Sequence, residues 1–208
     1  MRQVYIHGLG QIPASWEKTI SNLKIDKQSI CPNLSEIVKG EEVNYQNLYK
    51  AFTNFCNQIP GPIDLCGLSL GGVLALNYAI DYPEKVHSLV LIAAQYKMPK
   101  KLLQYQNIMF RFMPKSMFQQ MGFTKVEFIE LCKTMMTLDF SKSLEKVSCP
   151  VLVVCGEKDG ANKKASVELA AILRNAELQV VNGSGHEINV EAPEKLADIL
   201  GVFYERVS

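Results

Sequence analysis

The sequence has almost no net charge and no pair of cysteines spaced to hold a metal. Lys plus Arg total 22 and Asp plus Glu total 21, so the net charge is +1. Such a balance gives no global field that favours nucleic acid or an anionic membrane. The six cysteines form no C-x-x-C pair and several stand within apolar runs, which favours reduced, buried thiols over disulfides or a zinc site. The expected partner is a small molecule.

Long hydrophobic runs are also missing. No uninterrupted apolar segment approaches the roughly 20 residues that cross a bilayer, so no membrane span is expected. Residues 1–6 lead directly into a strand pattern, with no basic leader and no cleavage site, and we therefore predict a cytoplasmic protein. A chain of 208 residues with 48% hydrophobic content has room for one sizeable core. We expect a single domain over 1–208.

Short runs rich in Val, Ile and Leu alternate with longer segments of helical period. The alternation predicts an α/β fold with a mostly parallel central sheet and helices on both faces. In such sheets, ligands bind at the carboxyl ends of the strands. The expected strands are 3–7, 28–31, 63–66, 87–93, 151–155 and 178–181, and the expected helices are 15–23, 45–58, 70–81, 163–173 and 192–206.

Residues 97–146 interrupt this alternation. A helix-like stretch at 102–113 ends before Pro114, and Thr124-Lys125-Val126-Glu127 has the spacing of a capping box in front of an amphipathic helix. The segment leaves the strand 87–93 at its carboxyl end. We therefore predict a short helical lid insertion, about 97–146, that lies over the strand ends.

The predicted lid is rich in methionine, phenylalanine and basic residues. Its apolar side chains are suited to line an adaptable pocket for an acyl or aromatic group, and equally suited to form the lid's own small core. The candidate pocket residues are Met109, Phe112, Met113, Met117 and Met135. Between residues 97 and 125 there are six basic residues and no acidic one. This pattern is typical of a solvated basic face, with an anionic substrate or surface as the alternative.

The pentapeptide Gly67-Leu68-Ser69-Leu70-Gly71 follows an apolar strand and opens a helix of small residues. A strand, a sharp turn, a serine and a helix form the context in which this motif carries a nucleophile. The two glycines leave room for the cramped backbone of such a turn. Under the alternative interpretation, Ser69 only caps the helix that follows it.

A serine hydroxyl becomes a nucleophile when a histidine takes its proton and an acid orients that histidine. The sequence has three histidines. His87 opens a strand and is expected on the far side of the sheet, while His7 is better suited to brace a loop. His186 lies after the last strand and before the last helix, where its ring can hang over the carboxyl ends. We predict that His186 is the base.

The acid is expected after the strand 151–155, in the turn Gly156-Glu157-Lys158-Asp159. Asp159 is preferred over Glu157 because the turn must extend past the strand end before it points back toward His186. Asp159 also fits a simpler structural role, as a turn residue or as the N-cap of the next helix.

The elbow around Ser69, the turn at Asp159 and the loop at His186, in this order, resemble the α/β-hydrolase superfamily and its small esterase-like members. The resemblance covers nearly the whole chain. His7-Gly8-Leu9-Gly10 is similar to the first oxyanion segment of the family, which implies an oxyanion hole formed by the backbone N–H groups of Leu9 and Leu70. It also implies that the leading antiparallel hairpin of larger relatives is absent.

The resemblance implies a serine hydrolase that cleaves a carboxylic ester or thioester of a small or medium acyl group, with the catalytic residues Ser69, Asp159 and His186. Such a reaction requires no metal and no organic cofactor. Two alternatives remain at this point. The same fold also serves C–C bond hydrolysis, elimination or acyl transfer, and a family member can be a non-catalytic ligand-binding protein. Composition specifies neither the acyl group nor the oligomeric state.

Overall fold

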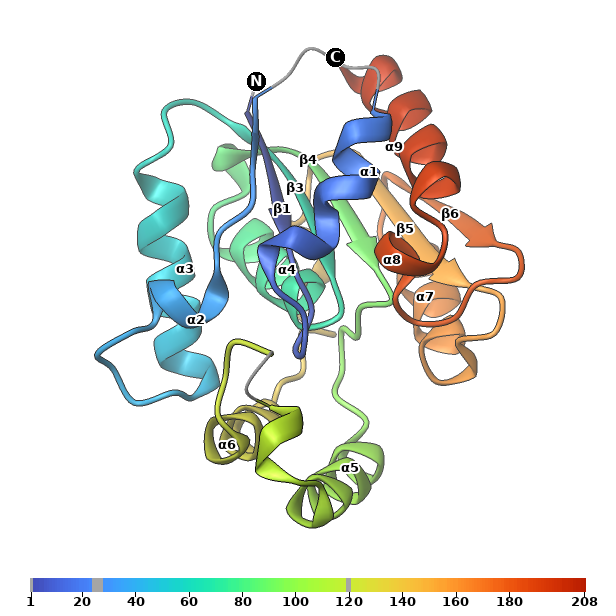
Figure 1. Cartoon of the computed structure of the whole chain (residues 1–208). Coiled ribbons are helices and arrows are strands. Elements are labelled where there is room, and N and C mark those ends of the chain that lie inside the picture. The colour runs from blue at the N-terminus through green and yellow to red at the C-terminus, as the bar shows by residue number, and fades with distance from the viewer. Residues whose placement is uncertain (1, 24–27, 119–120) are drawn as a thin grey trace.

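Six parallel strands form the centre of the computed structural model, which describes residues 2–23, 28–118 and 121–208 (Figure 1). The strand order is β2-β1-β3-β4-β5-β6, and each described pairing of neighbouring strands is parallel. The predicted α/β class with a mostly parallel sheet is therefore confirmed. The strands are β1 (Arg2–Ile6), β2 (Ser29–Ile30), β3 (Ile63–Leu68), β4 (Val86–Ile92), β5 (Val151–Gly156) and β6 (Ala176–Val181).

Helices connect the strands and cover both faces of the sheet (Figure 1). Helices α1, α8 and α9 lie against one face, and α3, α4 and α7 lie against the other. The helices are α1 (Glu17–Asn22), α2 (Leu34–Ile37), α3 (Tyr45–Asn57), α4 (Leu70–Asp81), α5 (Lys100–Phe112), α6 (Lys125–Met135), α7 (Gly160–Ile172), α8 (Ile188–Glu191) and α9 (Pro193–Val207). Of these, α2 and α8 were not predicted, because a single turn of helix is too short to show a helical period.

The core consists of two apolar clusters, one on each face of the sheet. Successive side chains of a strand point to opposite faces, so Val4 and Ile6 enter the larger cluster and Tyr5 enters the smaller one. There the ring of Tyr5 packs against Trp16, with 5.3 Å between the ring centroids. Because both faces of the central strands are covered, β3, β4 and β5 read as nearly continuous apolar runs, and this is why the sequence located them. The edge strands β2 and β6 are partly exposed.

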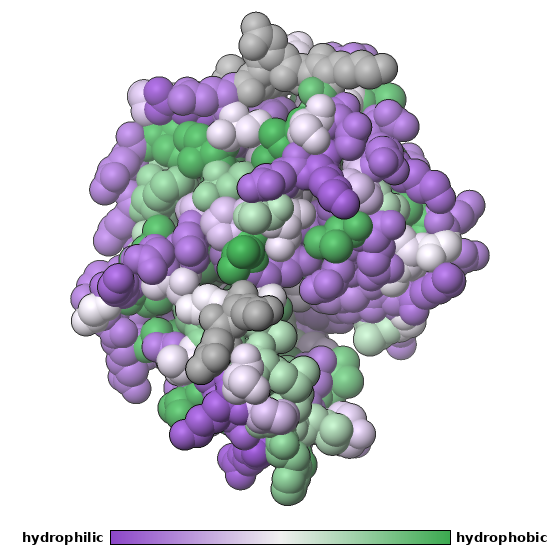
Figure 2. All heavy atoms as spheres, in the orientation of Figure 1, coloured by the Kyte–Doolittle hydropathy of each residue, from purple (hydrophilic) through white to green (hydrophobic). Residues whose placement is uncertain are grey.

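Helices α5 and α6 come between β4 and β5 in the chain and lie beyond the carboxyl ends of the strands (Figure 1). In the space-filling view this end of the molecule shows both apolar and polar surface (Figure 2). The predicted capping box is present, because the Thr124 side chain accepts from the Glu127 N–H while the Glu127 side chain accepts from the Thr124 N–H. The predicted lid insertion includes residues 119 and 120, which lie outside the described residues.

All six cysteines are free thiols, and Cys31 is the one that is not fully buried. Burial raises the pKa of the Cys132 thiol to about 12, which keeps it protonated at neutral pH. Among the described helices, none has the length and apolar character needed to pass through a bilayer.

Candidate active site

Ser69 lies between β3 and α4 in a strained backbone conformation, with φ 53° and ψ −115°. A positive φ is rare for a residue with a side chain. A Cβ at Gly67 would lie 2.3 Å from the carbonyl oxygen of Gly71, so the turn closes only with glycine there. Ser69 occupies the N-cap position of α4, but its side chain makes no capping hydrogen bond. The hydroxyl is therefore not engaged in holding the helix.

His186 and Asp159 form a hydrogen-bonded pair at the ends of two neighbouring parallel strands. Nδ1 of His186 lies 2.7 Å from Oδ2 of Asp159. Asp159 follows β5 and His186 follows β6, and the two loops touch at Gly156, where a Cβ would lie 2.0 Å from the carbonyl oxygen of Gly185. The Lys158 N–H also donates to the Ser184 carbonyl at 2.9 Å. The contact between these loops brings the two side chains together.

Asp159 has both of the roles that the sequence allowed for it. It is the N-cap of α7, where its carboxylate accepts from the Asn162 N–H at 3.4 Å, and it also holds the ring of His186. Its side chain is only 7% exposed. Burial by itself raises the pKa of Asp159, but the hydrogen bonds from His186 and Asn162 outweigh burial and leave the pKa below its ordinary value. The carboxyl group is therefore an anion at neutral pH.

Asn162 and Gln95 extend this pair into a network that the sequence did not predict. The side-chain N–H₂ of Asn162 lies 2.8 and 2.9 Å from the two carboxylate oxygens of Asp159 and 3.1 Å from Nδ1 of His186. Its carbonyl oxygen accepts from Nε2 of Gln95 at 2.8 Å. The spacing of Asn162, three residues after a capping aspartate, is the one signal in the sequence, because side chains at that spacing reach back to the cap.

Ser69, Asp159 and His186 line one cavity of about 420 Å³. Since Nδ1 of His186 faces Asp159, its Nε2 lies on the opposite side of the ring. Neither Nε2 of His186 nor Oγ of Ser69 has a protein hydrogen-bond partner among the described residues. In hydrolases, such contacts often tighten only when a substrate is bound. The arrangement can therefore supply a hydroxyl, an imidazole and a buried anion to a molecule within the cavity.

The loop after β1 lies directly against Ser69. A Cβ at Gly8 would be 3.5 Å from Cβ of Ser69. His7 braces this loop, as predicted, because its Nδ1 donates to the Gly8 carbonyl at 2.9 Å and its Nε2 accepts from the Leu34 N–H at 3.2 Å. Burial lowers the pKa of His7, so the ring is neutral at neutral pH. Leu70 begins α4, and the N–H of a first helical residue has no partner within the helix.

The sequence model of the alpha/beta hydrolase family matches residues 3–199. The chain belongs to this family. The sheet of parallel strands, the strained serine after β3 and the His186–Asp159 pair have the order and location that the resemblance implied.

Three relatives illustrate the range of this alpha/beta hydrolase's neighbours. "Monoacylglycerol lipase ABHD6" from Mus musculus is 23% identical over 166 residues, which cover 70% of this chain and 49% of the relative. The chain therefore spans about half the length of that relative. The solved structure of an esterase from Thermogutta terrifontis has a TM-score of 0.82 at 18% identity. The match covers 100% of this chain and 90% of the esterase chain. A carboxylesterase structure from Nitrososphaera gargenis has a TM-score of 0.85 at 19% identity. The match covers 99% of this chain and 90% of the carboxylesterase chain.

The alpha/beta hydrolase cavity is lined by a different side of α5 from the one that sequence analysis favoured. Of the five candidate pocket residues, Met135 lines the cavity, whereas Met109, Phe112 and Met117 are exposed and Met113 packs half-buried against the core. Helix α5 is apolar on two sides, so its period did not reveal which side faces inward. The side chains that line the cavity from the helical segment are Met98, Pro99, Leu102, Leu103, Gln106 and Met135.

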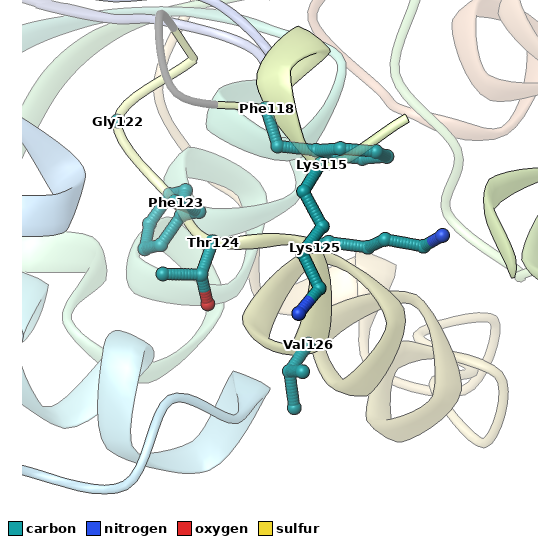
Figure 3. Close-up of a pocket in the computed structure, with 7 residues that line it drawn as sticks. All are labelled: Lys115, Phe118, Gly122, Phe123, Thr124, Lys125 and Val126. Atoms are coloured by element: carbon teal, nitrogen blue, oxygen red, sulfur yellow. The ribbon is translucent and has the colours of Figure 1, made fainter. Parts of the chain in front are cut away.

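A second cavity, of about 480 Å³, lies on the helical segment itself (Figure 3). Its lining includes Lys115, Phe118 and residues 122–126, and it contains none of Ser69, Asp159 and His186. Among the residues that the structure describes, no group of three or more His, Cys, Asp and Glu side chains is arranged to hold a metal ion.

Proposed function

We propose that the chain is a serine hydrolase that cleaves a carboxylic ester or thioester of a small or medium acyl group. One observation carries the proposal: the Asp159–His186 pair, joined at 2.7 Å, lines the same cavity as the strained Ser69. The names of the relatives, which are esterases and a lipase, support an ester as the substrate. Belonging to the alpha/beta hydrolase family supports hydrolysis over ligand binding alone.

In the proposed reaction, Oγ of Ser69 attacks the carbonyl carbon while Nε2 of His186 takes its proton. Asp159 stabilises the resulting imidazolium through Nδ1. The tetrahedral intermediate collapses, and His186 gives the proton to the leaving alcohol or thiol, which leaves an acyl group on Ser69. Water then attacks this acyl ester with His186 as the base, and the acid is released as the Ser69 hydroxyl re-forms.

The backbone N–H groups of Leu9 and Leu70 are proposed to bind the negative oxygen of both tetrahedral intermediates. The contact of Gly8 with Ser69 and the position of Leu70 at the start of α4 support this assignment. A donor of this kind typically lowers the barrier by about 3 to 4 kcal/mol. Since the donors are backbone groups, substitution of the leucine side chains leaves them in place.

The helical segment 97–146 is proposed to act as a short lid within a single domain over 1–208. Its residues close one wall of the cavity with apolar side chains, among them Met98, Leu103 and Met135. A volume of about 420 Å³ falls at the small end of the range of ligand pockets. This size supports a small or medium acyl group as the part of the substrate that enters.

Fluorophosphonate labelling of the whole protein tests the proposal. The expected result is one labelled site at Ser69, loss of labelling in Ser69→Ala, and retained labelling in the control variant His87→Ala. A panel of p-nitrophenyl esters and acyl thioesters of graded length is expected to show a burst followed by steady turnover. Labelling of Ser69 no faster than a surface serine, together with no acyl-enzyme on any member of the panel, contradicts the proposal.

A further inference from the structure

Helix α5 exposes a row of large apolar side chains that nothing in the described structure covers. The row runs along one side of the helix with a spacing of three or four residues, which is the spacing of one helical face. Its most exposed members are Phe112, at 82%, and Tyr105, at 62%. The opposite side of α5 packs inward through Leu103, Phe110 and Met113. We call the row the exposed strip, and it consists of Leu102, Tyr105, Ile108, Met109 and Phe112.

The charged residues on α5 and on the chain segments next to it are all positive. Lys100, Lys101, Arg111 and Lys115 are exposed near it, and no acidic residue occurs between residues 97 and 126. A net charge of +1 for the whole chain therefore hides a local basic region at this end of the molecule. An apolar helical face bordered by Lys and Arg is typical of helices that lie in the interface of a membrane.

The exposed strip is continuous with the cavity that contains Ser69. Leu102 belongs to the strip and also lines the cavity, where Leu103 and Gln106 of the same helix join it. A molecule bound along the strip therefore contacts a side chain that also lines the cavity. This continuity connects the surface to the proposed hydrolytic site.

We propose that the exposed strip docks on an anionic lipid surface and that α5 presents the cavity to the acyl chains of a lipid ester held there. The apolar side chains enter the lipid, while the four cations contact the anionic headgroups. A second copy of the chain fits the strip less well, because a symmetric contact brings the same positive charges against each other. The substrate part of this proposal rests on the proposed function, whereas the docking part does not.

Co-sedimentation with vesicles tests the docking. The wild-type protein is expected to bind vesicles of phosphatidylcholine mixed with phosphatidylglycerol, to bind pure phosphatidylcholine much more weakly, and to be released by salt. Each lysine near an anionic surface strengthens binding about fivefold, so Lys100→Glu with Lys101→Glu is expected to weaken binding by more than about 30-fold. The matched control is Lys18→Glu with Lys50→Glu, two exposed lysines outside α5.

The apolar part of the docking is tested by Ile108→Ser with Phe112→Ser, two exposed positions outside the cavity lining. This variant is expected to lose most of its binding to mixed vesicles. Val167→Ser with Val202→Ser, which are similarly exposed on α7 and α9, is the matched control and is expected to bind as the wild type does. Equal binding by the strip variant and this control overturns the proposal.

Activity measurements separate the docking from the proposed function. Hydrolysis of a water-soluble p-nitrophenyl ester without vesicles is expected to be unchanged in the double lysine variant and in the Ile108→Ser, Phe112→Ser variant. Hydrolysis of an ester lipid in mixed vesicles is expected to fall together with binding in both. If the protein hydrolyses soluble esters but binds no vesicles, the docking is wrong and the proposed function stands. If it binds vesicles but Ser69→Ala leaves ester hydrolysis intact, the proposed function is wrong and the docking stands. If the wild-type protein is a dimer and the Ile108→Ser, Phe112→Ser variant is a monomer, the strip binds a second copy of the chain. That result also overturns the docking.

Discussion

Among the residues that the structure describes, two histidine–aspartate pairs lie at opposite ends of the sheet. In both, Nδ1 of the histidine lies 2.7 Å from a carboxylate oxygen: His186 with Asp159 at the carboxyl end, and His87 with Asp64 at the amino end. Both aspartates are buried. The amino-end pair also has a serine, because the Ser88 hydroxyl donates to Oδ1 of Asp64 at 2.7 Å. Each end of the sheet therefore contains a serine, a histidine and an aspartate.

The two groups differ in where the serine lies. Ser88 is bonded to the carboxylate, so its proton faces the acid and not the imidazole, and its side chain is fully buried. Ser69 lines the same cavity as the Asp159–His186 pair, and its side chain makes no capping hydrogen bond. A histidine–aspartate distance alone therefore does not distinguish the two groups. They differ because Ser69 lines a cavity that a substrate can occupy and Ser88 is buried.

The largest expected effect separates the two histidines. His186→Ala and Ser69→Ala are each expected to lower kcat for a p-nitrophenyl ester by at least about 10⁴-fold, because each removes a group that acts in the same step. His87→Ala is expected to leave kcat close to that of the wild type. Steady-state kinetics on the three purified variants, with circular dichroism to confirm folding, make the comparison.

His7 offers a further control on the assignment of the base. It lies close to Ser69 in the chain's fold, through Gly8, but both of its ring nitrogens are engaged in bracing the loop. Loss of activity in a folded His7→Ala variant, with activity kept in His186→Ala, contradicts the assignment of His186.

The aspartates are expected to differ in the kind of damage their loss causes. Asp159→Asn is expected to lower kcat by about 10⁴-fold with little loss of stability, because the ring of His186 loses its orienting anion. Asp64→Asn is expected to lower the free energy of unfolding by about 2 kcal/mol or more, since buried donors lose a charged acceptor, and to leave kcat unchanged. Urea unfolding and ester kinetics on both variants provide the test. A common loss of activity with no difference in stability contradicts the distinction between the two ends.

The sequence was informative wherever one physical rule fixed the answer. The central strands β3, β4 and β5 are buried on both faces and appear as nearly continuous apolar runs, so the sequence located them. The edge strands β2 and β6 are only partly buried, and their bounds differ more from the predicted ones. Because parallel strands end at the same edge of the sheet, the sequence also indicated that Asp159 and His186 lie close together. The turn at Ser69 was recognisable in the sequence because both of its glycines are required. A Cβ at Gly67 or at Gly71 would lie less than 3 Å from a backbone carbonyl oxygen. Because parallel strands also begin at one common edge, His87, at the start of β4, was correctly expected at the edge opposite to Ser69.

Sequence reasoning failed where two faces of one element were both apolar or where a side chain acts through another side chain. The period of α5 did not reveal that Leu103 and Gln106 face the cavity while Met109 and Phe112 face outward. The spacing of Asn162 and Asp159 within one segment is a signal for their contact, but the contact of Asn162 with His186 joins the loop after β5 to the loop after β6. No pattern in a single segment contains that second contact.

A smaller effect is expected from Asn162, which donates to the aspartate of the carboxyl-end pair. Asn162→Ala removes donors to both oxygens of Asp159, so the pKa of Asp159 is expected to rise toward its ordinary value and the ring of His186 loses support. We expect kcat/KM to fall about 10- to 100-fold, because small displacements of catalytic groups are costly. The pKa of Asp159, followed by NMR titration of its carboxyl carbon, is expected to be higher in the variant than in the wild type.

Asn175 provides the matched control, since its side chain donates to the Ser148 carbonyl far from the site. Asn175→Ala is expected to keep both the rate and the Asp159 pKa of the wild type. An Asn162→Ala variant with lowered stability but an unchanged rate and an unchanged Asp159 pKa shows that Asn162 only caps α7, and contradicts its role in positioning Asp159.

The smallest expected effect is a pH dependence of stability that comes from the buried His7. Burial lowers the pKa of His7 below its ordinary value of 6.5. Below pH 6.5, therefore, His7 binds a proton in the unfolded chain before it does so in the folded protein. The free energy of unfolding is therefore expected to fall as the pH decreases from about 6.5, by at most about 1.4 kcal/mol per pH unit for one proton. Asp159 adds little in this range, because its pKa is below 3.8 in the folded state and close to that ordinary value in the unfolded chain, so it is ionised in both. Urea unfolding between about pH 7.5 and pH 5 measures the slope. His7→Gln, which retains a donor and an acceptor for the Gly8 and Leu34 bonds, is expected to flatten it, and an unchanged slope in that variant assigns the pH dependence to another group.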